Sequence, residues 1–416
     1  MTSRFNHKIR DNQDSRLDER KVNLRNVLYF TIGLFSPFSM IVNEFKVYPI
    51  EIIFAIYVIL NSRAIVKIDS NLSFSRIFFL FIVILIGIAL SSIRNDVSTN
   101  NLIAEISNVI FFLFDIAFLY IAIMRHAFSY LIIGCLSGTV FFNLFLNQQR
   151  FDTFWKFNAV TLVFLIIMYL RFRKLSKLQS LFVTGLTIFA LITSVLNDSR
   201  IFAALFATHL SLRFIEGKVS LGKSAWPTIF IVIFSLLIFY NLYVFLVTNG
   251  YMGQAAYIRY ASGVANPLGP IIGARVNNLI TLQYLFESPL WGHGAYAPIQ
   301  IGSHFNSDLL AYSEQESLVF VNSYTPHSLI LRFWYSGGLI SLIAAVSIYL
   351  SYFKMIILTI KNNWSRNLPL IVLITTAFLF NPISGFSRVT LASLLSIAFY
   401  AFVKQSQLNI HQKSQN

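Results

Sequence analysis

Long apolar runs, separated by short polar connections, dominate the chain from residue 27 to residue 403. A helix needs about 20 mostly apolar residues to cross the hydrocarbon core of a bilayer, and several of these runs reach that length. The pattern predicts an all-α fold: a polytopic transmembrane bundle of about 12 helices, with one long outer loop that carries short helices. The expected helices span residues 27–43, 47–60, 75–92, 102–124, 127–146, 154–170, 179–196, 201–214, 227–248, 328–353, 368–383 and 389–403.

The composition excludes an ordinary soluble protein, because 56% of the 416 residues are hydrophobic and only 12% are charged. The first residues are polar and of mixed charge, without the apolar core and cleavage site of a removable signal, so we expect a tail there. The expected segments are a cytoplasmic N-terminal tail (1–26), transmembrane helices one to nine (27–248), a large outer loop (249–327), transmembrane helices ten to twelve (328–403) and a cytoplasmic C-terminal tail (404–416).

The formal charge of +15 follows membrane topology rather than nucleic-acid binding. Basic residues are scattered between the apolar runs, so nucleic acid is not an expected partner. Most of the 32 Lys and Arg residues fall on the side of the N-terminus when the expected helices are followed along the chain. The positive-inside rule then places both termini in the cytoplasm and residues 249–327 on the outer face. The basic residues expected at the outer face or outer helix ends are Lys46, Arg94, Arg150, Lys156, Arg200, Arg259, Arg275, Arg332 and Arg388.

Three expected helices begin at the outer face with a basic or titratable side chain, in the segments NDSRIF, TPHSLI and GFSRVT. Free N–H groups at a helix start favour anions, and arginines add bidentate hydrogen bonds to phosphate. A further cation, Arg275, begins an expected amphipathic helix in the outer loop. We therefore expect a phosphate or diphosphate site formed by Arg200 and Arg275, with Arg388 as a further candidate. The alternatives are a local pair between Arg200 and Asp198 and a headgroup anchor at Arg388.

His327 lies where a polar stretch gives way to an apolar run of membrane length. Thr325 suits the cap and Pro326 the first position of the helix, which would put His327 in the first turn. The helix dipole there favours a neutral imidazole, so His327 is the candidate general base, and simple hydrogen bonding at the interface is the alternative. Gly337 and Gly338 follow, and they would allow either the close approach of another helix or a bend.

Three acidic residues fall within the apolar runs, where an ionised group is costly unless it is paired or faces water. Glu51 and Glu105 fall in the outer turns of expected helices, and Asp115 lies deeper. We expect these acids to pair with outer arginines. Glu105 is a candidate supporting residue of the anion site, together with Gly338.

No metal or cofactor is expected. The sequence has no Walker loop, no dinucleotide glycine fingerprint and no His–Glu zinc helix. Its one cysteine, Cys135, cannot form an intrachain disulfide or a cysteine metal cluster. A substrate of this protein would therefore have to arrive already activated, within the membrane.

These features resemble the bacterial O-antigen ligases and O-antigen polymerases, multi-helix membrane glycosyltransferases with one long periplasmic loop. The ligase signature is a His, then Asn, Ser or Gln, nine residues, a Gly, two residues, and Gly, Thr or Tyr. Here it reads His327, Ser328, nine residues and Gly338, and it departs from the signature at Ser341.

Two further patterns of the family have counterparts in the chain, and the resemblance covers the layout of nearly its whole length. A Thr-Arg pattern at a helix start is matched by Ser199–Arg200. A Gly-x-Arg near a loop helix, followed by a Pro-x-x-Gly turn, is matched by GAR at 273–275 and SPLWGHG at 288–294.

The resemblance implies transfer of a glycan from undecaprenyl diphosphate to a sugar hydroxyl, at the periplasmic face of the bacterial inner membrane and without a metal. Arg200 and Arg275 would hold the leaving diphosphate, and His327 would orient or deprotonate the acceptor. The acceptor would be another lipid-linked repeat unit in a polymerase and the lipid A core in a ligase. The departure at Ser341 and the Phe, Ile, Asn and Ser bias favour the polymerase.

The expected partners are this lipid-linked glycan, membrane lipid and a chain-length regulator. A flippase or other transporter of lipid-linked sugars is the alternative class, although the sequence shows no internal repeat of the kind common in transporters.

Overall fold

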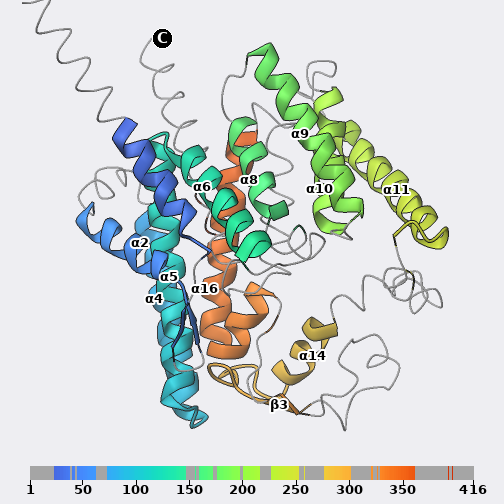
Figure 1. Ribbon diagram of the computed structural model, residues 1–416. Helices are drawn as coiled ribbons and strands as arrows, with labels where there is room; N and C mark the ends of the chain where they lie inside the picture. The colour runs from blue at the N-terminus through green and yellow to red at the C-terminus, as the bar shows by residue number, and fades with distance from the viewer. Residues whose placement is uncertain are drawn as a thin grey trace, which may run out of the picture.

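The computed structural model of the chain is almost wholly helical in the part that it describes (Figure 1). Four described helices are long and apolar enough to cross a membrane, judged by length and composition: α4 (Ser73–Arg94), α5 (Thr99–Met124), α9 (Lys177–Leu196) and α16 (Leu329–Ile360). This supports the predicted class of a helical membrane protein. The structure describes residues 23–37, 40–42, 45–61, 73–146, 155, 159–171, 176–196, 200–215, 226–252, 257, 276–300, 320–321, 326, 328–360, 392 and 396.

Most of the predicted helices in the described part of the chain are present within a few residues of their expected bounds; of the helix expected at 154–170, the structure describes Trp155, Ala159 and α8 (Val160–Arg171), all helical. The helices expected at 368–383 and 389–403 lie outside the described residues, except for Ala392 and Ser396. The other helices are α2 (Pro49–Leu60), α6 (Phe128–Val140), the π-helix η1 (Phe141–Leu146), α8 (Val160–Arg171), α10 (Arg200–Ile215), α11 (Trp226–Thr248) and α14 (Val276–Leu285).

The prediction of one helix over 27–43 is wrong. Helical residues run from 23 to 34, a turn follows at 35–37, and the strand β1 (Met40–Val42) begins where the helix was expected to continue. The reason is Pro37, which lacks an N–H donor and disfavours the helical conformation of the residue before it. Strand β1 pairs antiparallel with β2 (Phe45–Val47), and this short hairpin leads into α2.

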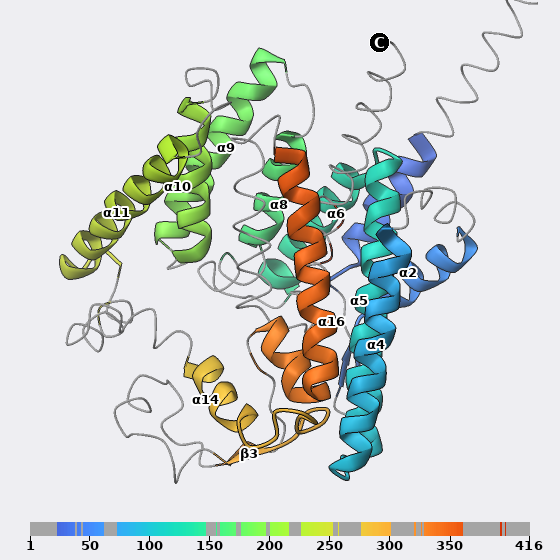
Figure 2. The same cartoon turned by 180° about the vertical axis from the view of Figure 1, so that it is seen from behind.

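The segment expected to form the outer loop, residues 249–327 and still called the outer loop below, contains the short helix that the sequence predicts. Helix α14 begins at Val276 and ends at Leu285, and a short antiparallel pair of strands follows it, β3 (Ile299–Gln300) with β4 (Phe320–Val321). Figures 1 and 2 show α14 and β3 at the end of the molecule where α4 ends and α5 begins. The described part of this segment therefore packs close to the ends of these helices.

Glycines bring the first helix, residues 23–34, into backbone contact with α6. A Cβ atom added to Gly33 would lie 2.8 Å from the backbone nitrogen of Cys135, and one on Gly134 would lie 3.1 Å from that of Leu34. Gly138 faces the backbone of Leu34 in the same way. Lipid tails are as apolar as the helices, so the hydrophobic effect does not drive membrane helices together. Small residues at a crossing let the two helices approach closely and gain van der Waals contacts instead.

Replacing Gly134 with alanine should destabilise this crossing, because the new methyl group would meet backbone atoms, which cannot move aside. We expect a loss of about 1–3 kcal/mol, typical of overpacking, measured as the free energy of unfolding in detergent. Gly185 is the matched control: it lies in α9 with no atom within 4 Å of an added Cβ. Gly185→Ala should be neutral or stabilising by up to about 1 kcal/mol, because alanine favours helices. Equal effects of the two changes would contradict the close crossing.

Helix α16 packs most extensively against α4, and small residues line this contact as well. An added Cβ on Gly337 would lie 2.9 Å from the backbone nitrogen of Ile88. The Ser341 hydroxyl donates a hydrogen bond to the Ile84 carbonyl across the contact at 3.2 Å. The serine that departs from the ligase signature thus joins two helices in the structure.

A polar cluster lies at the C-terminal end of α5. Arg125 Nη2 donates to Asn61 Oδ1 at 2.9 Å, and the guanidinium also donates to the Tyr57 hydroxyl. The Tyr57 hydroxyl in turn lies 2.9 Å from that of Tyr29. This cluster ties the first helix, α2 and α5 together at the end away from the outer loop.

Candidate functional site

Helix α16 is broken at Gly338, which has φ 66° and ψ −162°. The break divides α16 into a short arm, residues 329–337, and a long arm, residues 339–360. Figure 2 shows the short orange arm beside the lower part of the long one, with the two arms meeting at the end of the molecule that carries α14. Both roles predicted for the glycine pair are confirmed, since Gly337 permits close approach to α4 and Gly338 provides the bend.

The turn after α14 caps both arms of the broken helix. The His293 N–H donates to the carbonyl of Tyr335 at 2.7 Å, which satisfies the end of the short arm. The Leu339 N–H donates to the carbonyl of Leu290 at 2.9 Å, which satisfies the start of the long arm. Gly292 lies so close that a Cβ there would be 2.6 Å from the Gly338 nitrogen. Backbone groups freed by a break in a membrane helix must find such partners inside the protein.

His293 also holds this turn through its ring. Its Nε2 lies 2.7 Å from the Tyr284 carbonyl in α14, and its ring stacks on that of Tyr335 at 4.9 Å between centroids. Because a carbonyl only accepts hydrogen bonds, Nε2 carries the proton. His293 is a structural residue that joins α14 to the short arm.

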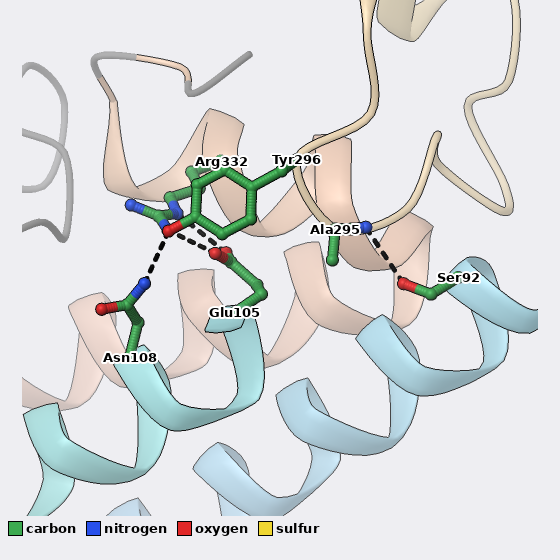
Figure 3. Close-up of polar contacts among 6 residues, drawn as sticks. All are labelled: Ser92, Glu105, Asn108, Ala295, Tyr296 and Arg332. Carbon is green, nitrogen blue, oxygen red and sulfur yellow. Dashed lines mark hydrogen bonds and ion pairs between the residues drawn. The ribbon is translucent and has the colours of Figure 1, made fainter. Parts of the chain in front are cut away.

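A buried ionic network joins the short arm to α5 and to the outer loop (Figure 3). Arg332 Nε donates to Glu105 Oε1 at 2.8 Å, and Nη2 donates to Glu105 Oε2, so the pair is bidentate. Arg332 Nη2 also donates to the Tyr296 hydroxyl at 3.1 Å. Asn108 Nδ2 donates to the same hydroxyl at 2.6 Å. Three parts of the chain that are distant in sequence therefore meet at one polar centre.

Burial makes this network energetically important. Glu105 and Arg332 are each 1% exposed, and Glu105 lies in α5, a helix of membrane-spanning length. Removing an ion from water costs several kcal/mol, which only close pairing and hydrogen bonding offset. The expectation that the buried acids pair with arginines is thus confirmed for Glu105. Both of its oxygens accept hydrogen bonds from Arg332, which suits a supporting role rather than proton transfer.

The backbone around Tyr296 is shaped to reach the network. Tyr296 has φ 48°, a left-handed conformation that few residues other than glycine adopt. Its neighbour Ala295 donates its N–H to the Ser92 hydroxyl in the last turns of α4 at 3.0 Å, and the Tyr335 hydroxyl donates to the Ala297 carbonyl at 3.2 Å. The segment 295–297 is therefore fixed to α4 on one side and to the short arm on the other.

Helix α16 begins within one residue of the start expected at 328, but its cap differs from the predicted one. Its first helical residue is Leu329, and the Ser328 hydroxyl accepts the Leu331 N–H at 3.3 Å as the cap. Pro326 is not helical, so the predictions of Thr325 as cap, Pro326 as first helical position and position 327 in the first turn are wrong. Serine is a strong capping residue, and Ser328 provides the cap of this helix. His327 itself lies outside the described residues, between Pro326 and Ser328, which are both buried.

The predicted anion-binding arginines fall largely outside the described part of the chain. Arg275 and Arg388 are not among the described residues, and Arg200 is described only as the first residue of α10. Convergence of Arg200 and Arg275 with His327 therefore stays a prediction. Within the residues that the structure describes, no group of three or more His, Cys, Asp or Glu side chains is placed to hold a metal ion.

The sequence analysis did not single out Arg332, Tyr296 or Asn108. Arg332 appears there only as one of several basic residues near outer helix ends. A usable signal exists, because an arginine and an acid that both fall in the outer turns of apolar helices need each other as counter-charges. Neither the choice of Arg332 among several arginines nor the tyrosine contact can be obtained from spacing alone.

The chain was compared with models of known protein families and with curated proteins, and no match was found in either comparison.

Proposed function

We propose that the chain is a metal-independent glycosyltransferase that transfers an undecaprenyl-diphosphate-linked glycan to a sugar hydroxyl of another lipid-linked repeat unit, as O-antigen polymerases do. In this proposal it crosses the bacterial inner membrane about 12 times, with both termini cytoplasmic and the active face periplasmic. One observation carries the proposal: two segments that provide the resemblance, the turn Pro289–Gly292 and Gly338, pack directly against each other.

The proposed reaction needs positive charge more than acid catalysis. The acceptor hydroxyl oxygen bonds to the anomeric carbon, the bond from that carbon to the diphosphate breaks, and the electron pair leaves with the lipid diphosphate. Arg200 and Arg275, with Arg388 as a further candidate, would stabilise the growing charge on the phosphate oxygens. His327 would take the proton of the acceptor hydroxyl. Glu105 would support the site through Arg332.

A transporter of lipid-linked sugars is the second candidate, and the broken helix α16 favours it. Discontinuous membrane helices often line substrate sites in transporters, near the middle of the bilayer. In this chain the break lies toward the end where α4 ends, and the turn after α14 closes it with backbone hydrogen bonds. That arrangement suits a site at one face better than a path through the centre, so we place the transporter second.

Deletion of the gene and complementation with variants test the proposal. Arg200→Ala, Arg275→Ala and His327→Ala should each insert normally yet lose long surface polysaccharide by at least about 10-fold, as expected for loss of charge stabilisation or general-base catalysis. Lys177→Ala, at an exposed basic residue that begins α9, is the control and should keep full activity.

The pattern of glycans on a lipopolysaccharide gel separates the candidates. A single repeat unit left on the lipid A core indicates a polymerase. Repeat units missing from the core, with lipid-linked polymer accumulating in the periplasm, indicate a ligase. Lipid-linked units trapped on the cytoplasmic side indicate a transporter. Normal polysaccharide in all three alanine variants, at normal protein levels, excludes the assigned residues.

A further inference from the structure

A turn of the outer loop, residues 286–291, exposes large apolar side chains directly after α14. Phe286 is 74% exposed, Leu290 61% and Trp291 44%. Several large apolar side chains exposed on so short a segment are typical of a contact surface rather than of a loop that faces only water. We propose that this segment, here called the apolar turn, inserts into the interfacial layer of the lipid bilayer on the side where α4 ends.

The protein holds the backbone of the apolar turn in place. The Leu290 carbonyl accepts the Leu339 N–H at 2.9 Å, and the Pro289 carbonyl accepts the indole N–H of Trp334 at 2.8 Å. These two carbonyls are therefore satisfied within the protein and need no water. An irregular segment can approach hydrocarbon only if its backbone polar groups are satisfied in this way.

Arg94 connects the apolar turn to the end of α4 through a contact with Trp291. It is the last residue of α4 and ends the candidate span Arg76–Arg94. Its guanidinium carbon lies over the Trp291 ring, 4.5 Å from the ring centroid. Tryptophan is enriched at the boundary between hydrocarbon and headgroups, and arginines near helix ends extend toward the headgroups. Trp291 therefore lies at the level where α4 leaves the hydrocarbon.

The neighbouring surface fits lipid as the partner. Ile93, in the last turn of α4, is 69% exposed on a helix long and apolar enough to cross a membrane. The apolar turn continues this exposed surface past the end of the helix, since Trp291 contacts Arg94, the next residue along. The charge of Arg94 also suits lipid phosphates, which lie just outside the hydrocarbon.

Insertion of the apolar turn would also fix the break in α16 relative to the membrane. Leu290 is exposed through its side chain while its carbonyl caps the start of the long arm. Leu290 would therefore contact lipid through its side chain and cap the long arm of α16 through its carbonyl. This inference does not depend on the proposed glycosyltransferase activity.

Site-directed fluorescence labelling of the full-length chain in lipid nanodiscs tests the inference. Cys135 is the chain's one cysteine and is buried, so a Cys135→Ser background leaves no reactive thiol. Phe286→Cys and Leu290→Cys, made separately, are each labelled with the fluorophore NBD. Quenching is measured with lipids spin-labelled near the headgroup and, separately, with aqueous iodide. Two positions are used so that a folding defect at one does not decide the result.

Two control positions calibrate the quenching. Ile93→Cys reports a lipid-exposed position on α4, and Asn100→Cys reports an exposed polar position in the first turn of α5. We expect Phe286→Cys and Leu290→Cys to be quenched by spin-labelled lipid at least half as strongly as Ile93→Cys, and by iodide less than Asn100→Cys. Quenching by iodide alone overturns the inference. Shielding from both quenchers also overturns it, because it would mean that protein, a second copy or another partner, covers the turn.

Discussion

Glu105→Met should destabilise the protein by about 3–5 kcal/mol, the cost of breaking a buried ion pair by removing one partner. Arg332 would keep its charge, because a guanidinium does not lose its proton in proteins, and it would remain 1% exposed without its carboxylate. Arg332→Met should cost less, because the carboxylate left behind can take up a proton and become neutral. A denaturant titration in detergent measures the free energy of unfolding of each variant and so tests both effects.

The double variant Glu105→Met with Arg332→Met isolates the pair. Its loss should be smaller than the sum of the two single losses, by about 0.5–3 kcal/mol, because neither charge is then left alone. Arg94→Met is the matched control at the same end of the molecule, since Arg94 is exposed, and it should change stability little. Additive losses in the double variant, or a loss at Arg94 equal to that at Arg332, would show that the pair does not hold the short arm.

A further variant, Glu105→Gln, separates support from catalysis. If Glu105 only holds the short arm of α16 in place, Glu105→Gln should retain part of the activity, because an amide oxygen can still accept one hydrogen bond from Arg332. A residue that transfers the proton itself would lose activity in that variant without a matching loss of stability.

Periodicity and length predict most of the fold, because the helices of a membrane protein satisfy their backbone hydrogen bonds internally. The runs that became α4, α5 and α11 need no distant partner to be helical, and their bounds are predicted within a few residues. The prediction of the first helix is wrong near Pro37. The proline is a local signal for a helix end, but the apolar residues on both sides of it outweighed that signal in the prediction.

The break in α16 depends on a segment that is distant in sequence. Gly337 and Gly338 predict either a bend or a close contact, and no local rule decides between them. The structure shows both, and the bend depends on the turn after α14, because its carbonyl at Leu290 and its N–H at His293 replace the hydrogen bonds lost at Gly338. The pairing of Glu105 with Arg332 is of the same kind, since the acid signals a need for a partner without identifying it.

Gly338→Ala should strongly disrupt the junction of the two arms of α16. The conformation φ 66°, ψ −162° is strongly disfavoured for residues with a Cβ, and such strain costs about 1–3 kcal/mol. The added Cβ would also lie 2.6 Å from the Trp291 carbonyl carbon and would collide with the Leu290 carbonyl oxygen. Both are backbone atoms, so the turn must separate from α16 and lose capping hydrogen bonds worth about 1 kcal/mol each.

Gly250→Ala separates the strain from the collision. Gly250 also has a positive φ, 78°, but no atom lies within 4 Å of its added Cβ, so only backbone strain is introduced there. The free energy of unfolding should therefore fall more for Gly338→Ala than for Gly250→Ala. Hydrogen exchange at the N–H groups of Leu339 and His293 should accelerate in the first variant alone, because these groups make the capping bonds. Unchanged exchange at both groups would mean that the turn after α14 does not hold the break, and the close packing of Gly292 on Gly338 would then have no structural role.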